Sequence, residues 1–333
     1  MTSTMNPLQI QVTRGNAVES EHIVDAVVVD TQGKIVRAHG NIDSLVFPRS
    51  AIKMIQALGF AESGALEKFE LTEKELSLAC ASHLGQDIHL LTVRAWLSKL
   101  GLTSENLECG AHKPYDEDAY VNLIRAGKSP ERVHNNCSGK HSGILSACLA
   151  YKEPTKGYSK YDHPAQVRLR KILGELSNLS YEKSPWGVDG CGIPTYAIPL
   201  KAIADSMAKL LPEAKVSADR SAAAKKILHA VKKYPEMISG VGGLCTEVIQ
   251  ISKGQSLLKT GAEGVYTALI PSKGLSIAIK CRDGASRASQ VAILHLLHQL
   301  GGLTDSQREE LRPYSDEIIR NWEKLQVGSV VCR

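Results

Sequence analysis

The sequence contains few aromatic residues: Phe, Trp and Tyr together make up 5% of the 333 residues. Its core must therefore be assembled mainly from aliphatic side chains. Long apolar runs are missing as well, because the most apolar stretch, residues 291–297, is interrupted by His295. A helix that crosses a bilayer needs about 20 consecutive apolar residues, so no membrane-spanning segment is predicted.

A strong net charge is also absent. The 40 Lys and Arg residues only slightly outnumber the 35 Asp and Glu residues, for a formal net charge of +5. The excess is spread along the chain without a basic block interleaved with aromatic residues, which argues against a nucleic-acid partner. The first residues show neither the basic start nor the apolar stretch of a secretory signal.

The eight cysteines lie far apart and lack the dense spacing of a disulfide framework. Together with the missing export signal, this spacing predicts reduced thiols in a cytoplasmic protein. Some of these thiols would then be available to bind a metal ion.

Hydrophobic periodicity predicts strands near both ends of the chain and helices between them. Residues 8–39 alternate apolar and polar positions around a turn near Gly33, which predicts two strands. Helical periodicity is found from Gln86 to Leu100 and through most of residues 117–235, where one helix is expected from Ile144 to Tyr151 after the small and polar residues 135–143. Short strand-like runs and a final helix follow at 244–251, 255–260, 264–270, 275–281 and about 285–300.

Strands that are distant in sequence can share one sheet with helices on its faces, so we predict an α+β or mixed α/β fold. No repeat, low-complexity tract or change of composition marks a domain boundary. We therefore expect a single domain over residues 1–333. Its sheet would come from about residues 5–45 and 240–300, and its helical lobe from about residues 65–235.

A serine and a lysine stand three residues apart in the tetrad from Ser50 to Lys53. At this spacing the two side chains share one face of a helix. A serine hydroxyl becomes a good nucleophile only when a base removes its proton, and a lysine is such a base when its pKa is lowered. Ser50 merely capping a helix beside a solvated lysine would give the same spacing, so the tetrad needs support from elsewhere.

That support comes from Lys259-Thr260-Gly261, which lies in a strand-like segment near the C-terminus. An early Ser-x-x-Lys and a late Lys-Thr-Gly are the layout of serine β-lactamases and penicillin-binding proteins. Their third element, Ser-Asp-Asn, is absent, and Tyr120-Val-Asn122 is only a loose substitute. Because no export signal is present, a cell-wall peptide is not the expected substrate.

Three further segments carry reactive side chains. Ser82 and His83 stand just before the helix predicted from Gln86. Cys137 and Cys191 lie in separate glycine-rich loops, where two thiols and one nitrogen would suit a catalytic zinc ion. Histidine is the usual nitrogen ligand of zinc in proteins, which favours His141, since Lys140 would have to bind as a neutral amine. Two buried free cysteines in tight loops remain the alternative.

Taken together, the motifs resemble those of the rhizobial-type (class 3) L-asparaginases, in which they occur in the same order. The segments that carry the resemblance are Pro48 to Lys53, Cys80 to His83, Asn136 to His141, Asp189 to Cys191, and Cys245-Thr246. It extends over the full chain, and the run Cys-Ser-Gly-Lys-His is its most specific part. The resemblance implies a serine β-lactamase-like fold, with an antiparallel sheet flanked by helices and a helical lobe. It further implies a homodimer that hydrolyses the side-chain amide of L-asparagine to L-aspartate and ammonia.

The resemblance also implies roles for individual residues. Ser50 would be the nucleophile and Lys53 its base, while Ser82 and Lys259 would form a second Ser–Lys couple. The zinc ligands would be Cys137, Lys140 and Cys191, against the chemical preference for His141. The positions that match the substrate pocket are Arg49, His141, Asp189 and Cys245. The sequence departs from the family at Arg282, where members often carry an acidic residue before Asp-Gly.

Three other functions are compatible with parts of this pattern. A β-lactamase-like or penicillin-binding acyl-enzyme would be labelled covalently by a penicillin. A metal-dependent amidohydrolase would lose all turnover on chelation, whereas an enzyme using serine as nucleophile would only be weakened. A zinc-binding protein without enzymatic activity would release no ammonia from any amide, and would leave the two Ser–Lys couples without a purpose.

Overall fold

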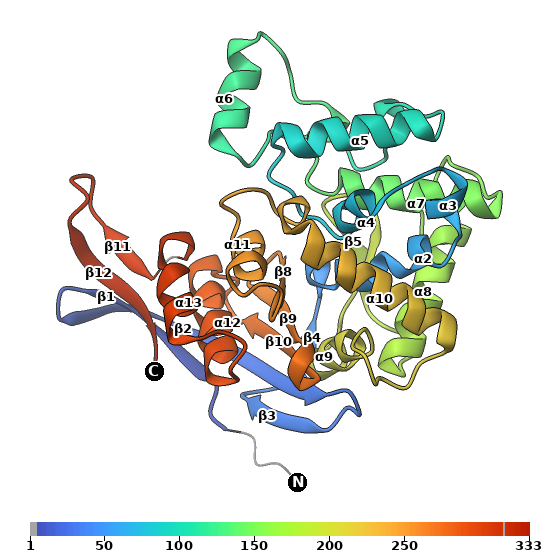
Figure 1. The fold of residues 1–333 in the computed structure, drawn as a ribbon. Coiled ribbons are helices and arrows are strands. Elements are labelled where there is room, and N and C mark those ends of the chain that lie inside the picture. Colours follow the sequence, from blue (N-terminus) through green and yellow to red (C-terminus); the bar gives the residue numbers. More distant parts are fainter. Residues whose placement is uncertain (1–4, 316) are drawn as a thin grey trace. The chain divides into compact units, whose positions relative to one another are not determined.

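The computed structural model describes residues 5–315 and 317–333 (Figure 1). The chain forms two compact units. Unit 1 contains the residues up to Ile52 together with Ala197–Lys215 and Glu247–Arg333. Unit 2 contains Lys53–Tyr196 and Val216–Thr246.

Unit 1 is built on a sheet of eight strands among the described residues, in the order β11-β12-β1-β2-β10-β9-β8 with β3 paired to β2. Each of these strands runs antiparallel to its neighbours. The strands are β1 (Leu8–Arg14), β2 (Ala17–Asp30), β3 (Ile35–His39), β8 (Leu257–Gly261), β9 (Val265–Ile270), β10 (Leu275–Cys281), β11 (Ile318–Arg320) and β12 (Gln326–Cys332).

The centre of this sheet is buried on both faces. All six residues of β9 are buried, and so are the consecutive residues 24–29 of β2. Uninterrupted burial of this kind requires cover on each face. Helices α9 (Leu200–Ala208) and α12 (Ser286–Gln299) pack against these strands. The other elements of unit 1 are β4 (Leu45–Val46), η1 (Arg49–Ile52), β7 (Ile198–Pro199), η5 (Pro271–Lys273), α13 (Asp305–Glu310) and η6 (Arg312–Tyr314).

Unit 2 is mainly helical, and α7 (Ser138–Tyr151) lies at its centre, in contact with α2, α3, α4, α5 and α8 (Figure 1). A Cβ added at Gly139 would lie 2.3 Å from Leu78 O, so only glycine lets α7 approach α4 this closely. The elements of unit 2 besides α7 are α1 (Lys53–Gln56), α2 (Leu58–Ala61), α3 (Ala65–Lys68), α4 (Glu73–Ala79), α5 (Asp87–Lys99), η2 (Ser104–Asn106), α6 (Glu117–Arg125), η3 (Arg132–His134), α8 (Pro164–Ser177), β5 (Trp186–Val188), β6 (Pro194–Tyr196), α10 (Ala218–Lys233) and η4 (Pro235–Met237).

The predicted fold class is confirmed, because an antiparallel sheet flanked by helices is accompanied by a helical unit. Helix α5 and helix α12 lie where the sequence predicts them, and so do strands β8, β9 and β10. No helix among the described residues is both long and apolar enough to cross a bilayer.

Three local predictions are wrong. Residues 244–251 form helix α11 (Leu244–Ile251), because short apolar runs suit either a strand or a buried helix. Residues 8–39 form three strands, since the chain also turns at Gly15. Helix α7 begins at Ser138, well before the expected start at Ile144, and thus includes Lys140 and His141.

Strand β8 passes very close to η1 in unit 1. A Cβ at Gly261 would lie 2.7 Å from Pro48 O and 3.1 Å from Ala51 N. Because both atoms belong to the main chain, neither can rotate away, and we expect Gly261→Ala to lower the free energy of unfolding by about 1–3 kcal/mol. Urea unfolding measures the change.

Gly187→Ala in β5 is the control for this prediction, since a Cβ there would meet no atom within 4 Å. The control should change the free energy of unfolding by less than about 0.5 kcal/mol. Equal stability of both variants would contradict the close approach of β8 and η1.

Candidate active site

Ser50 lies inside the short helix η1 of unit 1, not at its N-cap as the sequence suggests, because η1 begins one residue earlier. The residue that begins it, Arg49, has a φ of 51°. Residues other than glycine rarely adopt this left-handed conformation, and such backbone strain concentrates at functional sites. Ser50 and Arg49 are both half-buried. The strained backbone thus directly precedes the predicted nucleophile.

Strands β8 and β9 hold η1 in place. The Thr267 hydroxyl on β9 donates to Ala51 O at 2.7 Å, and Gly261 lets β8 pass beside Pro48. Lys259 on β8 is fully buried, and its Nζ donates to Thr260 O at 2.9 Å. Unit 1 therefore brings the serine of the Ser-x-x-Lys motif and the Lys-Thr-Gly strand together, as the layout of the motifs predicts.

Lys53, the first residue of α1, belongs to unit 2 and is almost completely buried. Its Nζ donates to Ser82 Oγ at 3.0 Å, to Cys137 Sγ at 3.0 Å and also to Ala81 O. An ammonium group has three N–H donors, and here each of them finds an acceptor. Lys53 thus links the predicted second serine to one of the two predicted metal-binding thiols.

The two glycine-rich cysteine loops meet in unit 2. Cys137 is the N-cap of α7, and Cys191 lies in a tight turn after β5 in which the Gly192 N–H donates to Asp189 O. The two sulfurs share a hydrogen bond, although neither is in a disulfide. Lys140 Nζ donates to Cys191 Sγ at 2.9 Å. Two thiols and one amine therefore converge, all of them buried.

The protonation of this cluster follows from its contacts. The hydrogen bond with Cys137 and the charge of Lys140 hold the pKa of Cys191 well below its usual value, in spite of burial. The same hydrogen bond, together with burial, raises the pKa of Cys137 to about 12. Burial lowers the pKa of Lys140, but the two thiols outweigh it and the net direction is upward. Without a metal, we therefore assign a Cys191 thiolate, a Cys137 thiol and a Lys140 ammonium group.

The donor chemistry of this cluster fits zinc, which binds thiolates together with a nitrogen ligand. Lys140 touches a sulfur, whereas no His nitrogen of the described residues lies within 4.8 Å of both thiols. His141 Nδ1 instead lies 2.8 Å from the Tyr158 hydroxyl. Lys140 is therefore the nitrogen that contacts a thiol in this structure, whereas the choice between Lys140 and His141 as a metal ligand stays a prediction.

A different group of possible metal ligands lies in unit 1, where donor atoms of His22, Cys281 and Asp283 lie within 4.8 Å of one another. Arg287 Nε–H donates to His22 Nε2 at 3.1 Å, so the ring hydrogen is on Nδ1 and points to Asp283 at 2.6 Å. The Cys281 thiol also donates to Asp283. These contacts make the group a satisfied hydrogen-bond network, and no ligand is needed to complete it.

The sequence matches one protein family, L-asparaginase II, over residues 10–332. The chain belongs to the L-asparaginase II family. It is accordingly an amidohydrolase that acts on asparagine, and the resemblance seen in its motifs is confirmed at this level. No curated protein matches the sequence.

Solved structures that align with this asparaginase-family protein include a β-lactamase from Mycobacterium bovis, at 14% identity and a TM-score of 0.41, over 84% of this chain and 95% of the other. A D-alanine carboxypeptidase AmpC from Burkholderia cenocepacia aligns at 13% identity and a TM-score of 0.41, over 84% and 93%. A protein from Bacteroides dorei that is named as a putative β-lactamase aligns at 11% identity and a TM-score of 0.37, over 83% and 85%.

The remaining site residues predicted for this asparaginase are placed as follows. Asp189 is half-buried, and its N–H donates to Ile193 O at 2.8 Å within the turn that carries Cys191. Cys245 is buried in α11, next to Thr246, whose hydroxyl is hydrogen-bonded to Ser239 and to Pro235 O. The structure places both residues in unit 2. Their roles toward a substrate stay predictions.

His83 is a residue whose role the sequence analysis does not assign. Its Nε2 donates to Ser138 Oγ at 2.8 Å, the Ser138 hydroxyl donates to Val133 O, and Gly85 N–H donates to its Nδ1. These bonds tie the segment that carries Ser82 to the start of α7 beside Cys137. The position of His83 directly after Ser82, a candidate catalytic serine, could have drawn attention to it. Sequence spacing, however, does not identify Ser138 as its hydrogen-bond partner.

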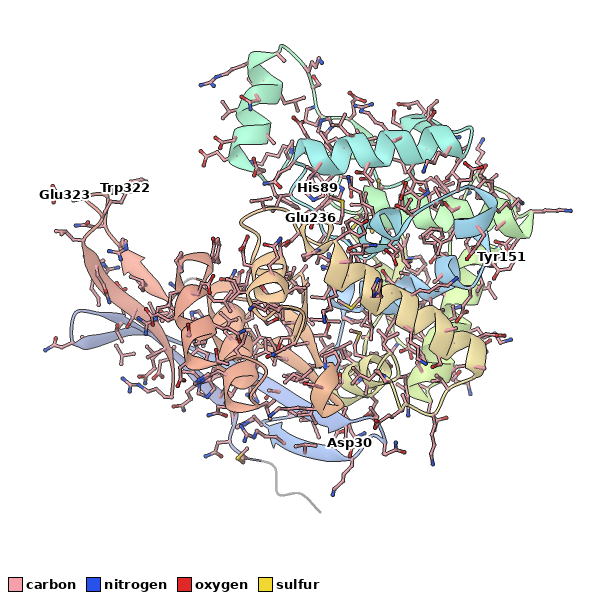
Figure 2. All side chains as sticks on the ribbon, viewed as in Figure 1. Asp30, His89, Tyr151, Glu236, Trp322 and Glu323 are labelled. Atoms are coloured by element: carbon pink, nitrogen blue, oxygen red, sulfur yellow. The ribbon has the colours of Figure 1, made fainter. Side chains whose placement is uncertain are left out.

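The ring of His89 stacks on His83 with centroids 4.8 Å apart, and its Nε2–H donates to Glu236 O at 3.0 Å (Figure 2). Burial lowers the pKa of His89 to about 4. Unfolded His89 takes up a proton below about pH 6.5, whereas the folded protein resists protonation down to about pH 4, so stability falls as pH falls between these values. The loss attributable to His89 is about 3 kcal/mol.

Urea unfolding at several pH values between 7 and 4 tests this assignment. In His89→Gln, the free energy of unfolding should depend less steeply on pH than in the wild type. Leu91→Gln, at an exposed position of the same helix and without a titrating group, is the control and should keep the wild-type slope. Identical slopes in the wild type and His89→Gln would show that His89 is not the group responsible.

Proposed function

We propose that this member of the L-asparaginase II family is a class 3, rhizobial-type enzyme that cleaves L-asparagine through a serine acyl-enzyme. The observation that carries the proposal is the contact of Lys53 Nζ with both Ser82 Oγ and Cys137 Sγ, each at 3.0 Å. It connects the lysine of the Ser-x-x-Lys tetrad to the thiol cluster, which comes from the most specific segments of the resemblance.

In the proposed reaction, Lys53 accepts the proton of Ser50, which is three residues away in the chain, and Ser50 Oγ attacks the side-chain amide carbon. Main-chain N–H groups at the start of the helix that carries Ser50 would stabilise the oxyanion. Lys53 passes the proton taken from Ser50 to the amide nitrogen, ammonia leaves, and a β-aspartyl ester on Ser50 remains. Water then hydrolyses the ester and releases L-aspartate.

Within unit 2, the contact of Lys53 with Ser82 would offer a route for proton transfer. Lys53 must give up a proton before it can serve as a base, and Ser82 Oγ, already in hydrogen-bond contact with it, would accept that proton while its own hydroxyl hydrogen passes to Lys259 of the second couple. The second couple, Ser82 with Lys259, joins residues of different units and is based on the resemblance alone. Arg49, His141, Asp189 and Cys245 would bind the substrate on the same basis.

The chemistry of the donor set supports zinc as the metal, held by Cys137, Lys140 and Cys191. A bound ion would supply a positive charge and an open coordination position that help to orient the substrate. The serine remains the attacking group in this proposal. All eight cysteines are free in the structure, which supports the predicted reducing, cytoplasmic environment. The homodimer stays a prediction of the resemblance.

Ser50→Ala tests the nucleophile. We expect kcat for ammonia release from L-asparagine to fall by at least about a thousandfold with folding intact, because no other group forms the ester. Ser44→Ala is the matched control, since this serine is also half-buried in unit 1 and donates only to Asn41 O among the described residues. Near-normal turnover in Ser50→Ala would rule out the serine mechanism.

Elemental analysis of purified protein tests the metal site. We expect about one zinc per wild-type chain and none in Cys137→Ala or Cys191→Ala, since each change removes one thiolate from the ligand set. Cys148→Ala, which removes another buried thiol of α7, should keep its zinc. A wild-type protein without zinc, or cysteine variants that retain it, would contradict the proposed ligands.

A further inference from the structure

His141 is fully buried in unit 2, one helical turn beyond Cys137, and one of its ring nitrogens lacks a partner. Nδ1 lies 2.8 Å from the Tyr158 hydroxyl, but Nε2 has no hydrogen-bond partner among the described residues. Leaving a buried polar atom unpaired costs about 1–3 kcal/mol. Such an atom beside a candidate active site therefore points to a group that arrives with a ligand.

The Tyr158 hydroxyl determines which nitrogen of His141 carries the hydrogen. Glu108 N–H donates to the Tyr158 oxygen at 2.7 Å, so the O–H of Tyr158 is left to donate to His141 Nδ1. In this arrangement the ring hydrogen of His141 is on Nε2. Among the Glu108 N–H, the Tyr158 hydroxyl and the two ring nitrogens of His141, only Nε2–H then lacks a hydrogen-bond partner. The opposite tautomer would leave both the Tyr158 O–H and Nε2 unsatisfied, so it is less favourable.

The position of Tyr158 is fixed by its neighbours. The Glu108 carboxylate accepts hydrogen bonds from Gly157 N–H at 2.5 Å and from the Ser159 hydroxyl and N–H at 2.6 and 2.9 Å. Gln166 Nε2 donates to Tyr158 O at 2.8 Å. Glu108 thus holds the main chain on both sides of Tyr158 as well as its hydroxyl. The ring is buried, so the hydroxyl has little freedom to leave His141.

We propose that Tyr158 is a positioning residue that fixes His141 in the tautomer with hydrogen on Nε2, so that Nε2–H donates to an oxygen of the bound substrate. The inference rests on the proposed function and deepens it. An imidazole N–H of fixed direction donates to a carboxylate or amide oxygen and offers no acceptor to the ammonium group of the same amino acid.

The tautomer is measured directly by NMR of the as-purified protein with ¹⁵N-labelled histidine rings. We expect a protonated Nε2 and an unprotonated Nδ1 for His141 in the wild type, and a shift toward the other tautomer in Tyr158→Phe. A protonated Nδ1 in the wild type, or an unchanged pattern in Tyr158→Phe, would overturn the proposal. This measurement needs no substrate, so it stands even if L-asparagine is not hydrolysed, a result that would refute only the proposed function.

The donor role is tested by calorimetric binding of L-aspartate, the product. We expect Tyr158→Phe to weaken binding at least about fivefold, whereas Tyr181→Phe, at a buried tyrosine packed on Tyr196, should bind like the wild type. β-Alanine lacks the α-carboxylate: a weakening that disappears with β-alanine assigns the donor to that group, and a weakening that persists assigns it to the side-chain carboxyl. Equal affinity of Tyr158→Phe and the wild type for L-aspartate would overturn the proposal.

A second pair of variants covers the case in which Tyr158→Phe does not fold. His141→Gln keeps an N–H donor near the position of Nε2 and should retain most of the affinity for L-aspartate, whereas His141→Leu should lose it. Equal binding by these two variants would show that Nε2–H contacts no substrate oxygen.

Discussion

The buried amine of Lys53 is the contact on which the arrangement of the candidate site in unit 2 depends. It donates to Ala81 and Ser82, which follow α4, and to Cys137, which begins α7. Burying an amine without acceptors would cost several kcal/mol, so both segments must converge on it. Gly139 makes this possible, because any larger residue would separate α7 from α4.

Near this amine, the protein places a second lysine and two thiols, and all of these side chains are buried. Lys53 contacts Cys137, and Lys140 contacts Cys191, so each positive side chain faces a sulfur. Such an arrangement is unusual for purely structural packing, since lysines are seldom fully buried. Groups with perturbed ionisation in one buried cluster are typical of functional sites. Burying the Lys140 ammonium group and the Cys191 thiolate lowers the stability of the fold. The proposed roles of the cluster in catalysis and metal binding would explain why the protein tolerates this loss.

The histidines of unit 2 show how the same burial produces defined donors. His83, His89 and His141 are all buried, and each has one ring nitrogen engaged by a specific partner. Because burial disfavours the charged imidazolium, these rings are neutral and the partner decides the tautomer. At His83 and His89 the N–H is used inside the protein. At His141, Nε2 has no partner among the described residues, and this observation is the basis for its proposed role toward a ligand.

The sequence alone was enough to predict the family and the segments that carry its chemistry. Local patterns identify the Ser-x-x-Lys tetrad, the Lys-Thr-Gly strand and the two cysteine loops. Tertiary structure alone decided that Lys53 meets Cys137, 84 residues away, that Lys140 rather than His141 contacts a thiol, and that Tyr158 orients His141. It also decided that residues 244–251 form a helix, since a short apolar run fits either kind of element. Spacing predicts contacts only within one helix or strand, whereas contacts between elements depend on packing that no local pattern encodes.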